Sequence, residues 1–271
     1  MAGEAGPTPD ATPGEAAPAR DTDPDPTRGL PSLDLHAPAR LLVLTGAGVS
    51  AESGLRTFRD SDGLWESHRV EDVATPGAFA RDPALVWSFY AARRSAAAAA
   101  EPNAAHRALA ACEERLGDRF LLVTQNVDGL HARAGSRRVL EIHGSLWRTR
   151  CSGCGRPPFE DRTEPTEPPR CDRCGGLLRP DIVWFGEQVD LQADHESKAF
   201  MKHATWDGAR LVFLAIGTSG AVWPASSMVR YASDQGADTW LANLAEADNA
   251  AWFHHQVLGP ATATVPALLG V

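Results

Sequence analysis

Long apolar runs are absent from this sequence of 271 residues. Its longest, such as residues 211–216, fall far short of the about 20 residues that cross a bilayer as a helix. The start of the chain lacks the basic and then apolar stretches of a secretory signal, and it holds too many acids for a transit peptide. We therefore expect a cytoplasmic protein with no membrane partner.

Basic charge is also scarce, with 26 Lys and Arg residues against 35 Asp and Glu residues and a formal net charge of -9. This balance argues against nucleic acid as the main partner. Much of the deficit lies in residues 1–36, which hold seven of the 20 prolines, seven acids, two bases and no aromatic residue. Such a segment cannot bury enough apolar surface to fold alone, so we expect a disordered, acidic, proline-rich tail.

Short apolar runs alternate with helical stretches in the rest of the chain. Four runs are typical of strands buried on both faces: Ala39–Thr45, Phe120–Thr124, residues 138–142 and Arg210–Ile216. Residues 106–116 show a helical pattern between the first and the second of these apolar runs. The alternation predicts an α/β fold in which helices cover both faces of a mostly parallel sheet.

Two segments interrupt this alternation. Residues 61–102 indicate helices and loops with several aromatic side chains, and residues 147–186 hold four cysteines and a stretch rich in Pro and Glu. We expect both segments to form a second, smaller domain. The boundaries that follow place residues 37–60, 106–146 and 205–271 in the large domain, and residues 61–105 and 147–204 in the small one.

The first predicted strand runs into a G-x-G-x-x-A turn, Gly46-Ala47-Gly48-Val49-Ser50-Ala51. Small residues at such a turn let backbone amides approach a pyrophosphate at a helix N-terminus. A tight strand-to-helix turn without a ligand is the alternative. The acid that binds a ribose about 20 residues further on is missing. A loop-like sequence follows instead, so a dinucleotide would be held in an unusual way.

Four cysteines form two pairs, Cys151 with Cys154 and Cys171 with Cys174, separated by 16 residues. This spacing suits one tetrahedral zinc ion, and four sulfur ligands leave no open position for catalysis. We therefore predict a structural zinc that holds a loop-rich unit together. Two disulfides or four unrelated thiols are the alternative, which a reducing compartment disfavours. The remaining Cys112 is typical of a small core residue.

Polar side chains follow two of the predicted strands. Gln125, Asn126 and Asp128 come after one strand, and His143 comes after the next. Ligands of open α/β sheets gather at the carboxyl ends of strands, so both clusters would face one crevice. A lone histidine is more often structural or solvated, and spacing alone gives His143 no role.

Tyr90 and Arg93 lie three residues apart on a predicted helix that begins at Pro83. They share a face of this helix and could offer a phenol and a guanidinium to a carboxylate. On the residues alone, a partly buried tyrosine and a solvated arginine are favoured. The adjacent Arg94 competes for the same role.

Together these residues resemble the sirtuins, the NAD-dependent protein deacylases, over nearly all of residues 37–271. The shared motifs stand in the family's order: Gly46 to Gly54, Thr57-Phe58-Arg59, Gln125 to His131, His143-Gly144-Ser145, the four cysteines, Phe185-Gly186-Glu187 and Gly217-Thr218-Ser219. In that family a Rossmann-like parallel-sheet domain and a smaller inserted domain, part zinc module and part helical, clasp NAD and an acyl-lysine peptide. The resemblance implies this fold, NAD as co-substrate, one structural Zn2+ and acyl-lysine proteins as substrates.

The resemblance also places residues around NAD, position by position. The turn and the loop that closes on NAD comprise Gly46, Ala47, Gly48, Glu52, Phe58, Arg59 and Trp65. Gln125 and Asp128 would line the nicotinamide side, and Asn126 would orient the ribose. The adenosine half would be held by Gly217, Thr218, Ser219, Asn243 and Ala261. The family often has an acid two residues after Asn243, whereas Ala245 stands there in this chain.

The implied reaction consumes NAD. The acyl amide oxygen attacks C1′ of the nicotinamide ribose, nicotinamide leaves, and His143 as general base deprotonates a ribose hydroxyl that takes the acyl group. An imidazole suits this role because its usual pKa of about 6.5 lies near the working pH. Gly186 and Glu187 lie in a stretch similar to the one that pairs with the substrate backbone.

Residues 89–94 are similar to the segment of the sirtuins that prefer succinyl- and malonyl-lysine, whose Tyr and Arg bind the acyl carboxylate. An acetyl group would leave the guanidinium without a partner. The resemblance therefore implies a desuccinylase and demalonylase that uses Tyr90 and Arg93. A sirtuin that is mainly a deacetylase is the alternative.

Other classes stay open from the sequence. A dehydrogenase with structural zinc would return NADH and no nicotinamide, but the missing ribose acid counts against it. A zinc-ribbon protein that binds nucleic acid would need a basic surface near the cysteines, whereas residues 157–169 hold three Glu and one Asp against one Arg. A sirtuin that binds NAD without catalysis is disfavoured because His143 and Asn126 are both present.

Overall fold

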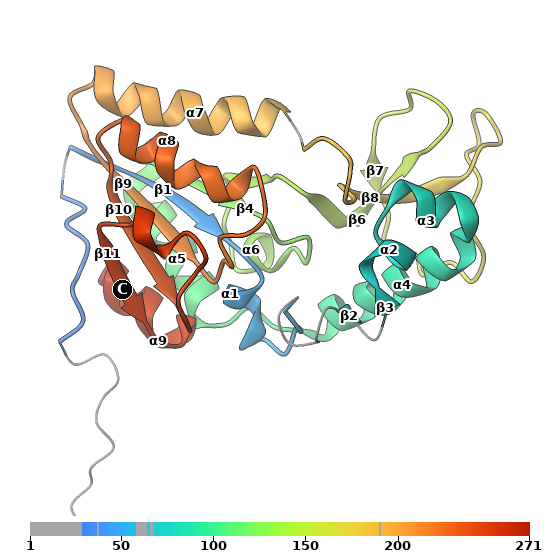
Figure 1. Cartoon of the computed structure of the whole chain (residues 1–271), viewed down its shortest axis with the longest axis horizontal. Helices are drawn as coiled ribbons and strands as arrows, with labels where there is room; N and C mark the ends of the chain where they lie inside the picture. Colours follow the sequence, from blue (N-terminus) through green and yellow to red (C-terminus); the bar gives the residue numbers. More distant parts are fainter. Residues whose placement is uncertain (1–28, 37, 58–63, 66–67, 190) are drawn as a thin grey trace, which may run out of the picture.

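The computed structural model describes residues 29–36, 38–57, 64–65, 68–189 and 191–271. A broad sheet with helices on both sides forms one end of the molecule, and short strands and helices form the other (Figure 1). The strands are β1 (Ala39–Thr45), β2 (Leu64–Trp65), β3 (His68–Arg69), β4 (Phe120–Thr124), β5 (Val139–Glu141), β6 (Gly144–Cys151), β7 (Phe159–Glu160), β8 (Leu178–Ile182), β9 (Arg210–Ile216), β10 (Asp238–Asn243) and β11 (His255–Leu258). The helices are α1 (Gly48–Ala51), α2 (Val70–Val73), α3 (Pro76–Arg81), α4 (Pro83–Ala99), α5 (Ala104–Leu116), α6 (Leu130–Arg133), α7 (Leu191–Trp206), α8 (Met228–Asp234) and α9 (Ala261–Leu269), with short 3-10 turns η1 (Gly117–Arg119), η2 (Ala225–Ser227) and η3 (Ala250–Trp252).

The large sheet has six strands in the order β11-β10-β9-β1-β4-β5, and every neighbouring pair in it is parallel. Its central strands are mostly apolar because helices cover both faces. Alternate residues of β1 point to opposite faces, so Leu42 and Leu44 pack in the core beside α7 and α8, whereas Leu41 and Val43 pack in the core beside α5 and α9. This sheet confirms the predicted α/β class.

The order of the strands creates a switch point in the middle of the sheet. The chain goes from β1 outward through β4 and β5, and later from β9 outward through β10 and β11. The carboxyl ends of β1 and β9 therefore lead into loops that diverge from neighbouring strands. Ligands of open α/β sheets bind at this position.

The smaller unit packs helices against a three-stranded antiparallel sheet in the order β7-β6-β8. Proline at the first position and a side-chain cap start both longer helices: Thr75 accepts from the amide of Ala78 before α3, and Asp82 accepts from that of Leu85 before α4. The indole of Trp87 on α4 donates to the carbonyl of Leu178 on β8 at 2.9 Å. A helical part and a strand-rich part thus share one core, as the predicted fold class requires.

Two details differ from the sequence-based expectation. Residues 29–36, predicted as part of the disordered tail, lie against the large sheet: the Leu33 side chain is buried and its amide donates to the carbonyl of Leu268 at 2.8 Å. Residues 1–28 lie outside the described part. Helix α7 falls within the predicted small domain, yet Phe200 and Met201 pack in the core of the large sheet. The spacing of apolar residues in α7 predicts a buried face. It does not indicate whether this face packs on the large sheet or on the smaller unit.

Among the described residues, the helices are too short or too polar to cross a membrane.

Candidate active site

The two glycines of the predicted phosphate turn lie where β1 meets α1, packed against the loop after β9. The amide of Gly48 donates to the carbonyl of Gly217 at 2.8 Å. A Cβ on Gly46 would lie 2.7 Å from the Gly217 carbonyl oxygen, and one on Gly217 would lie 2.3 Å from the amide nitrogen of Val49. Gly217 also has a φ of +60°, which favours glycine. The switch point therefore demands glycine on both loops, whether or not a phosphate binds there.

Asn126 and Asp128 reach this turn from the loop after β4. The Asn126 Nδ2 donates to the carbonyl of Gly46 and to Ser50 Oγ, each at 3.1 Å. Ser50 Oγ in turn donates to Asp128 Oδ2 at 2.8 Å, and the amide of Leu130 donates to Asp128 Oδ1 at 2.8 Å. Burial raises the pKa of Asp128, and these two hydrogen bonds oppose the rise. The network fixes the amide and the carboxylate at the carboxyl end of the sheet.

His143 stands between β5 and β6, and its ring is held by the same loop. Its Nδ1 lies 3.1 Å from the carbonyl oxygen of Gln125. A carbonyl only accepts hydrogen bonds, so Nδ1 carries the proton and Nε2 keeps a lone pair. Burial lowers the pKa of His143, which keeps the imidazole neutral near pH 7. A neutral imidazole with a fixed tautomer can accept a proton at Nε2.

A second chain of hydrogen bonds joins the loops after β4, β9 and β10. Gln125 Nε2 donates to Thr218 Oγ1 at 3.1 Å, and Asn243 Nδ2 donates to the carbonyl of Thr218 at 3.0 Å. Ser219 follows in the same loop, and its hydroxyl accepts from the amide of Ala221 at 3.2 Å. The residues predicted for the two halves of NAD are thus brought to one edge of the sheet.

The remaining residues predicted for NAD lie elsewhere or outside the description. The Glu52 carboxylate accepts from the amide and the hydroxyl of Thr262 at 3.0 and 2.6 Å, so it caps the start of α9, where Ala261 is the first residue. Ala47 is exposed beside α1. Phe58 and Arg59 lie outside the described residues, as does the side chain of Trp65. Their roles stay predictions.

Tyr90 and Arg93 lie on α4 at the end of the smaller unit that faces the Asp128 loop. Tyr90 is fully buried and its hydroxyl accepts a hydrogen bond from Trp184 Nε1 at 3.0 Å. Burial raises the pKa of Tyr90 to about 12, so the phenol stays protonated. The charge of Arg93 lowers the pKa of both Tyr90 and Asp128, which places the guanidinium within electrostatic reach of both. The cation also lies 5.8 Å from the ring of Phe89.

Arg94 is excluded as the competitor of Arg93. Its side chain is 1% exposed and is committed to the strand-rich part of the smaller unit. Its Nε donates to the carbonyl of Leu146 at 2.7 Å, and its Nη1 donates to that of Thr163 at 2.6 Å. Neighbouring positions on a helix point about 100° apart, so one arginine is buried while the other faces the site.

Gly186 and Glu187 follow β8, where a substrate strand is predicted to pair. Gly186 is exposed with a φ of +88°. The carboxylate of Glu187, however, is bound within the protein. It accepts two hydrogen bonds from Arg179, at 2.6 and 2.9 Å, and one from the amide of Trp184 at 2.9 Å. Its side chain supports the turn.

The four cysteines gather at one end of the β7-β6-β8 sheet, and their Sγ atoms all lie within 4.8 Å of one another. All four are free thiols, which excludes the alternative of disulfides. The Cys151 and Cys174 sulfurs are 3.5 Å apart and the Cys154 and Cys171 sulfurs 4.0 Å apart, close to the about 3.8 Å spacing of ligands in a tetrahedral zinc site. Backbone amides of glycines donate to Cys151 and Cys174 sulfurs. This donor set fits one structural zinc.

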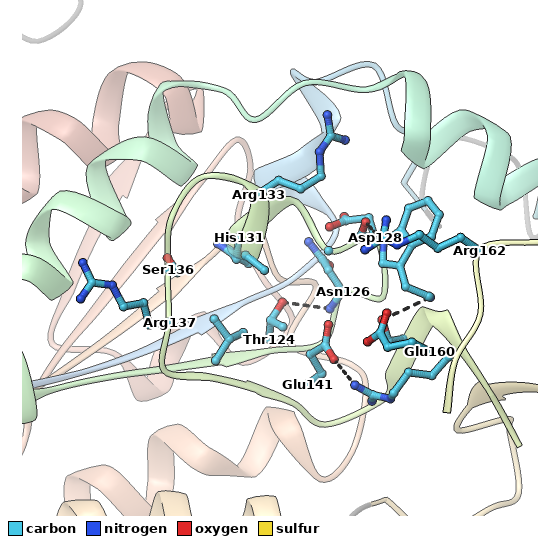
Figure 2. Close-up of a pocket in the computed structure, with 16 residues that line it drawn as sticks. Thr124, Asn126, Asp128, His131, Arg133, Ser136, Arg137, Glu141, Glu160 and Arg162 are labelled. Carbon is cyan, nitrogen blue, oxygen red and sulfur yellow. Dashed lines mark hydrogen bonds and ion pairs between the residues drawn. The ribbon is translucent and has the colours of Figure 1, made fainter. Parts of the chain in front are cut away.

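A pocket of about 420 Å³ lies behind the loop that carries Asn126 and Asp128 (Figure 2). Asn126 and Asp128 line it, whereas His143 and the glycine turn do not, so the pocket shares only part of its lining with the crevice at the strand ends. Two of its lining residues have a buried side-chain atom, His131 Nδ1 and Ser136 Oγ, that has no hydrogen-bond partner among the described residues. The loop that carries Asn126 and Asp128 therefore borders a pocket that is lined partly by polar side chains.

Sequence reasoning did not single out Ser50, His106, His131 or Trp184. The rings of the two histidines pack against each other with centroids 4.8 Å apart and planes tilted by 55°. His131 Nε2 lies 2.9 Å from Thr45 Oγ1, and His106 Nε2 lies 3.4 Å from Ser50 Oγ. Burial lowers their pKa values to about 4 for His106 and about 3 for His131, so both are neutral. Only a contact between distant segments reveals such residues, because each alone looks like a core or solvated side chain.

Comparisons with known proteins agree with this geometry. The Sir2 family profile matches residues 46–224. An NAD-dependent protein deacylase of Salmonella typhimurium is 50% identical over 230 residues, which cover 84% of this chain and 81% of the relative. One from Aquifex aeolicus is 46% identical over 207 residues, 76% of this chain and 84% of the relative.

Solved structures give the same result. A Sir2 homologue in complex with NAD has a TM-score of 0.76 and 41% identity, with 84% of this chain and 88% of that chain covered. A mutant Sir2 homologue in complex with 2′-O-acetyl ADP ribose has a TM-score of 0.76 and 41% identity, with 86% and 91% covered. Fold, site geometry and sequence identity agree, and the chain belongs to the Sir2 family, the sirtuins.

Proposed function

We propose that this protein is an NAD-dependent protein-lysine deacylase that moves an acyl group from lysine to ADP-ribose and releases nicotinamide. The observation that carries the proposal is His143: its Nδ1 is held by the Gln125 carbonyl, and its neutral Nε2 is left as a base at the edge where Asn126 and Asp128 gather. The named activity of the relatives from Salmonella typhimurium and Aquifex aeolicus supports it.

The residues of this chain have separable tasks in that reaction. NAD, when bound, supplies a ribose acceptor and nicotinamide as leaving group. Gln125, Thr218 and Asn243 form one hydrogen-bonded set at the strand ends and suit the contacts of a dinucleotide. Asn126 is fixed by Gly46 and Ser50, so its amide is pre-oriented. His143 accepts a proton from a ribose hydroxyl at Nε2. The four cysteines hold zinc away from the chemistry and support the smaller unit.

We further propose a preference for succinyl- and malonyl-lysine over acetyl-lysine. Tyr90 is a neutral phenol whose oxygen already accepts from Trp184, so its own hydrogen is available to a carboxylate. Arg93 supplies a positive charge near that phenol. A dicarboxylic acyl group can accept from both, whereas an acetyl group has no such oxygen.

The test is nicotinamide release from matched succinyl-, malonyl- and acetyl-lysine peptides, with kcat/KM for each. Arg93→Met should raise KM for the succinyl peptide about tenfold to a hundredfold and leave the acetyl peptide within about twofold, because a charge-assisted pair is lost. Equal losses on all peptides would contradict the acyl preference but not the deacylase. Production of NADH without nicotinamide would contradict the deacylase itself.

A further inference from the structure

Trp184 lies at the centre of the acyl end of the site, directly after β8. Its side chain is 2% exposed, and its ring packs against that of Phe79 with centroids 5.3 Å apart. Its Nε1 donates to the Tyr90 hydroxyl at 3.0 Å. An indole of this size would fill the core equally well without that contact, so the direction of its N–H is a separate property.

We propose that Trp184 is a positioning residue for acyl selectivity, because its indole N–H fixes the direction in which the Tyr90 phenol donates to an acidic acyl group. This inference rests on the proposed preference for succinyl and malonyl groups. A phenol has one hydrogen and two lone pairs. The Trp184 N–H occupies one lone pair, so the phenol hydrogen must point away from the indole. The donor is thus oriented before the substrate arrives.

The ion pair of Arg179 and Glu187 contacts both the ring and the backbone of Trp184. The Arg179 guanidinium lies over the Trp184 ring, 3.2 Å from its centroid, and makes two hydrogen bonds to Glu187. Glu187 also accepts from the backbone amide of Trp184 at 2.9 Å. Arg179 is 5% exposed and also donates to the carbonyl of Ile182 at 2.7 Å. The ring and the backbone of Trp184 are therefore fixed together.

This arrangement connects the two halves of the substrate site. Glu187 lies next to exposed Gly186, in the turn predicted to meet the peptide backbone, whereas Tyr90 lies on α4 at the predicted acyl carboxylate. The route from Glu187 through Arg179 and Trp184 to Tyr90 consists of described contacts. Glu187 thus acts through Arg179 and Trp184, in addition to its place in the turn.

The experiment uses the full chain and the variant Trp184→Phe, which removes the N–H but keeps an aromatic ring. Trp87→Phe is the matched control, because that indole lies in the same core and donates to the carbonyl of Leu178 instead of to Tyr90. We expect Trp184→Phe to raise KM for succinyl-lysine about fivefold with KM for acetyl-lysine within about twofold, the scale of one hydrogen bond. Trp87→Phe should leave the ratio of the two kcat/KM values unchanged.

The Tyr90→Phe background isolates the contact. If Trp184 acts through the phenol, Trp184→Phe should change the succinyl-to-acetyl ratio no further in Tyr90→Phe protein. A ratio change of equal size in that background, or equal losses on both peptides, would overturn the role of Trp184 alone. If Tyr90→Phe itself leaves the ratio unchanged, the proposed acyl preference fails together with the inference.

A second measurement covers the case in which Trp184→Phe does not fold. The indole N–H signal of Trp184 in 15N-labelled protein should shift in Tyr90→Phe and again when a succinyl-lysine peptide binds the wild-type protein. An acetyl-lysine peptide should shift it less. A signal that is unmoved by Tyr90→Phe would overturn the proposed contact.

Discussion

The large sheet and the smaller unit reach a defined site by different means. The six-stranded sheet is held by apolar cores on both faces and brings its polar residues together through the ends of parallel strands. The smaller unit includes three strands of only two residues each, β2, β3 and β7, and depends on four cysteines and a buried arginine. An apolar core of regular strands and helices can thus position the loops at its edge. A loop-rich unit needs specific metal ligands and buried hydrogen bonds in addition.

Loss of zinc should give the largest difference in stability between the two units. Cys171→Ser removes one of four ligands, and structural zinc sites contribute about 10–16 kcal/mol in small modules, so β6 and β8 should lose protection from hydrogen exchange and deacylation should cease. Strands β1 and β9 should stay protected. Cys112→Ser, in the core of the large sheet, is the control that leaves zinc bound. Unchanged protection of β6 and β8 in Cys171→Ser would show that the small unit does not depend on the metal.

His143 lies at the junction of the two units, between β5 and β6. Its substitution should reduce activity without unfolding either unit. His143→Ala removes the base at Nε2, so kcat should fall about 100-fold to 10,000-fold. Thermal unfolding should change little, because within the described part of the chain the ring makes one hydrogen bond, to the Gln125 carbonyl. Turnover at the wild-type rate would refute the general-base role.

Arg94 is a buried arginine whose hydrogen bonds join α4 to the strand-rich part of the smaller unit. Arg94→Met should destabilise this unit by roughly 3–5 kcal/mol, because the carbonyls of Leu146 and Thr163 each lose a hydrogen bond and the Asp161 carboxylate loses its ion pair with Arg94. Its neighbour Arg93 is the matched control: Arg93→Met should change the free energy of unfolding by less than about 1 kcal/mol. Urea unfolding of both variants measures the difference. Similar losses of unfolding free energy in the two variants would show that both arginines stabilise the fold, which would contradict a functional role for Arg93 alone.

Mild acid should weaken the large sheet through its buried histidines. His106 and His131 have pKa values of about 4 and about 3 in the folded protein, below the usual 6.5. The unfolded chain therefore binds more protons as pH falls below about 6.5, and stability drops in that window by about 2 kcal/mol per histidine at pH 5. Unfolding in urea at pH 7 and pH 5 measures this slope.

His131→Asn should remove about half of that pH dependence, whereas His254→Asn, at an exposed position, should leave it intact. A slope that is the same in wild type and His131→Asn would show that other groups cause the acid sensitivity.

Much of the large sheet could be predicted from the sequence. The bounds of β1, β4 and β9 agree with the apolar runs, because strands buried on both faces are mostly apolar and have few polar residues beyond those near their ends. The fifth strand is shorter than predicted, covering Val139–Glu141. Edge strands bury less surface, so their ends are marked less clearly by hydrophobicity.

The zinc site was also predictable, since its four ligands come in two local pairs whose spacing specifies the donor set. The hydrogen-bonded sets around Asn126, Thr218 and Trp184 were not. Each joins residues far apart in the chain, such as Tyr90 and Trp184, and no local pattern reports which side chains will meet.

The class of sheet, the glycine turn and the zinc ligands could be read from the amino-acid order alone, because they depend on local periodicity and spacing. The tertiary structure decided which of two adjacent arginines is buried, which tautomer His143 holds, where α7 packs and what supports Tyr90. Those outcomes depend on burial and on hydrogen-bond partners from other segments, and burial is a property of the packed chain.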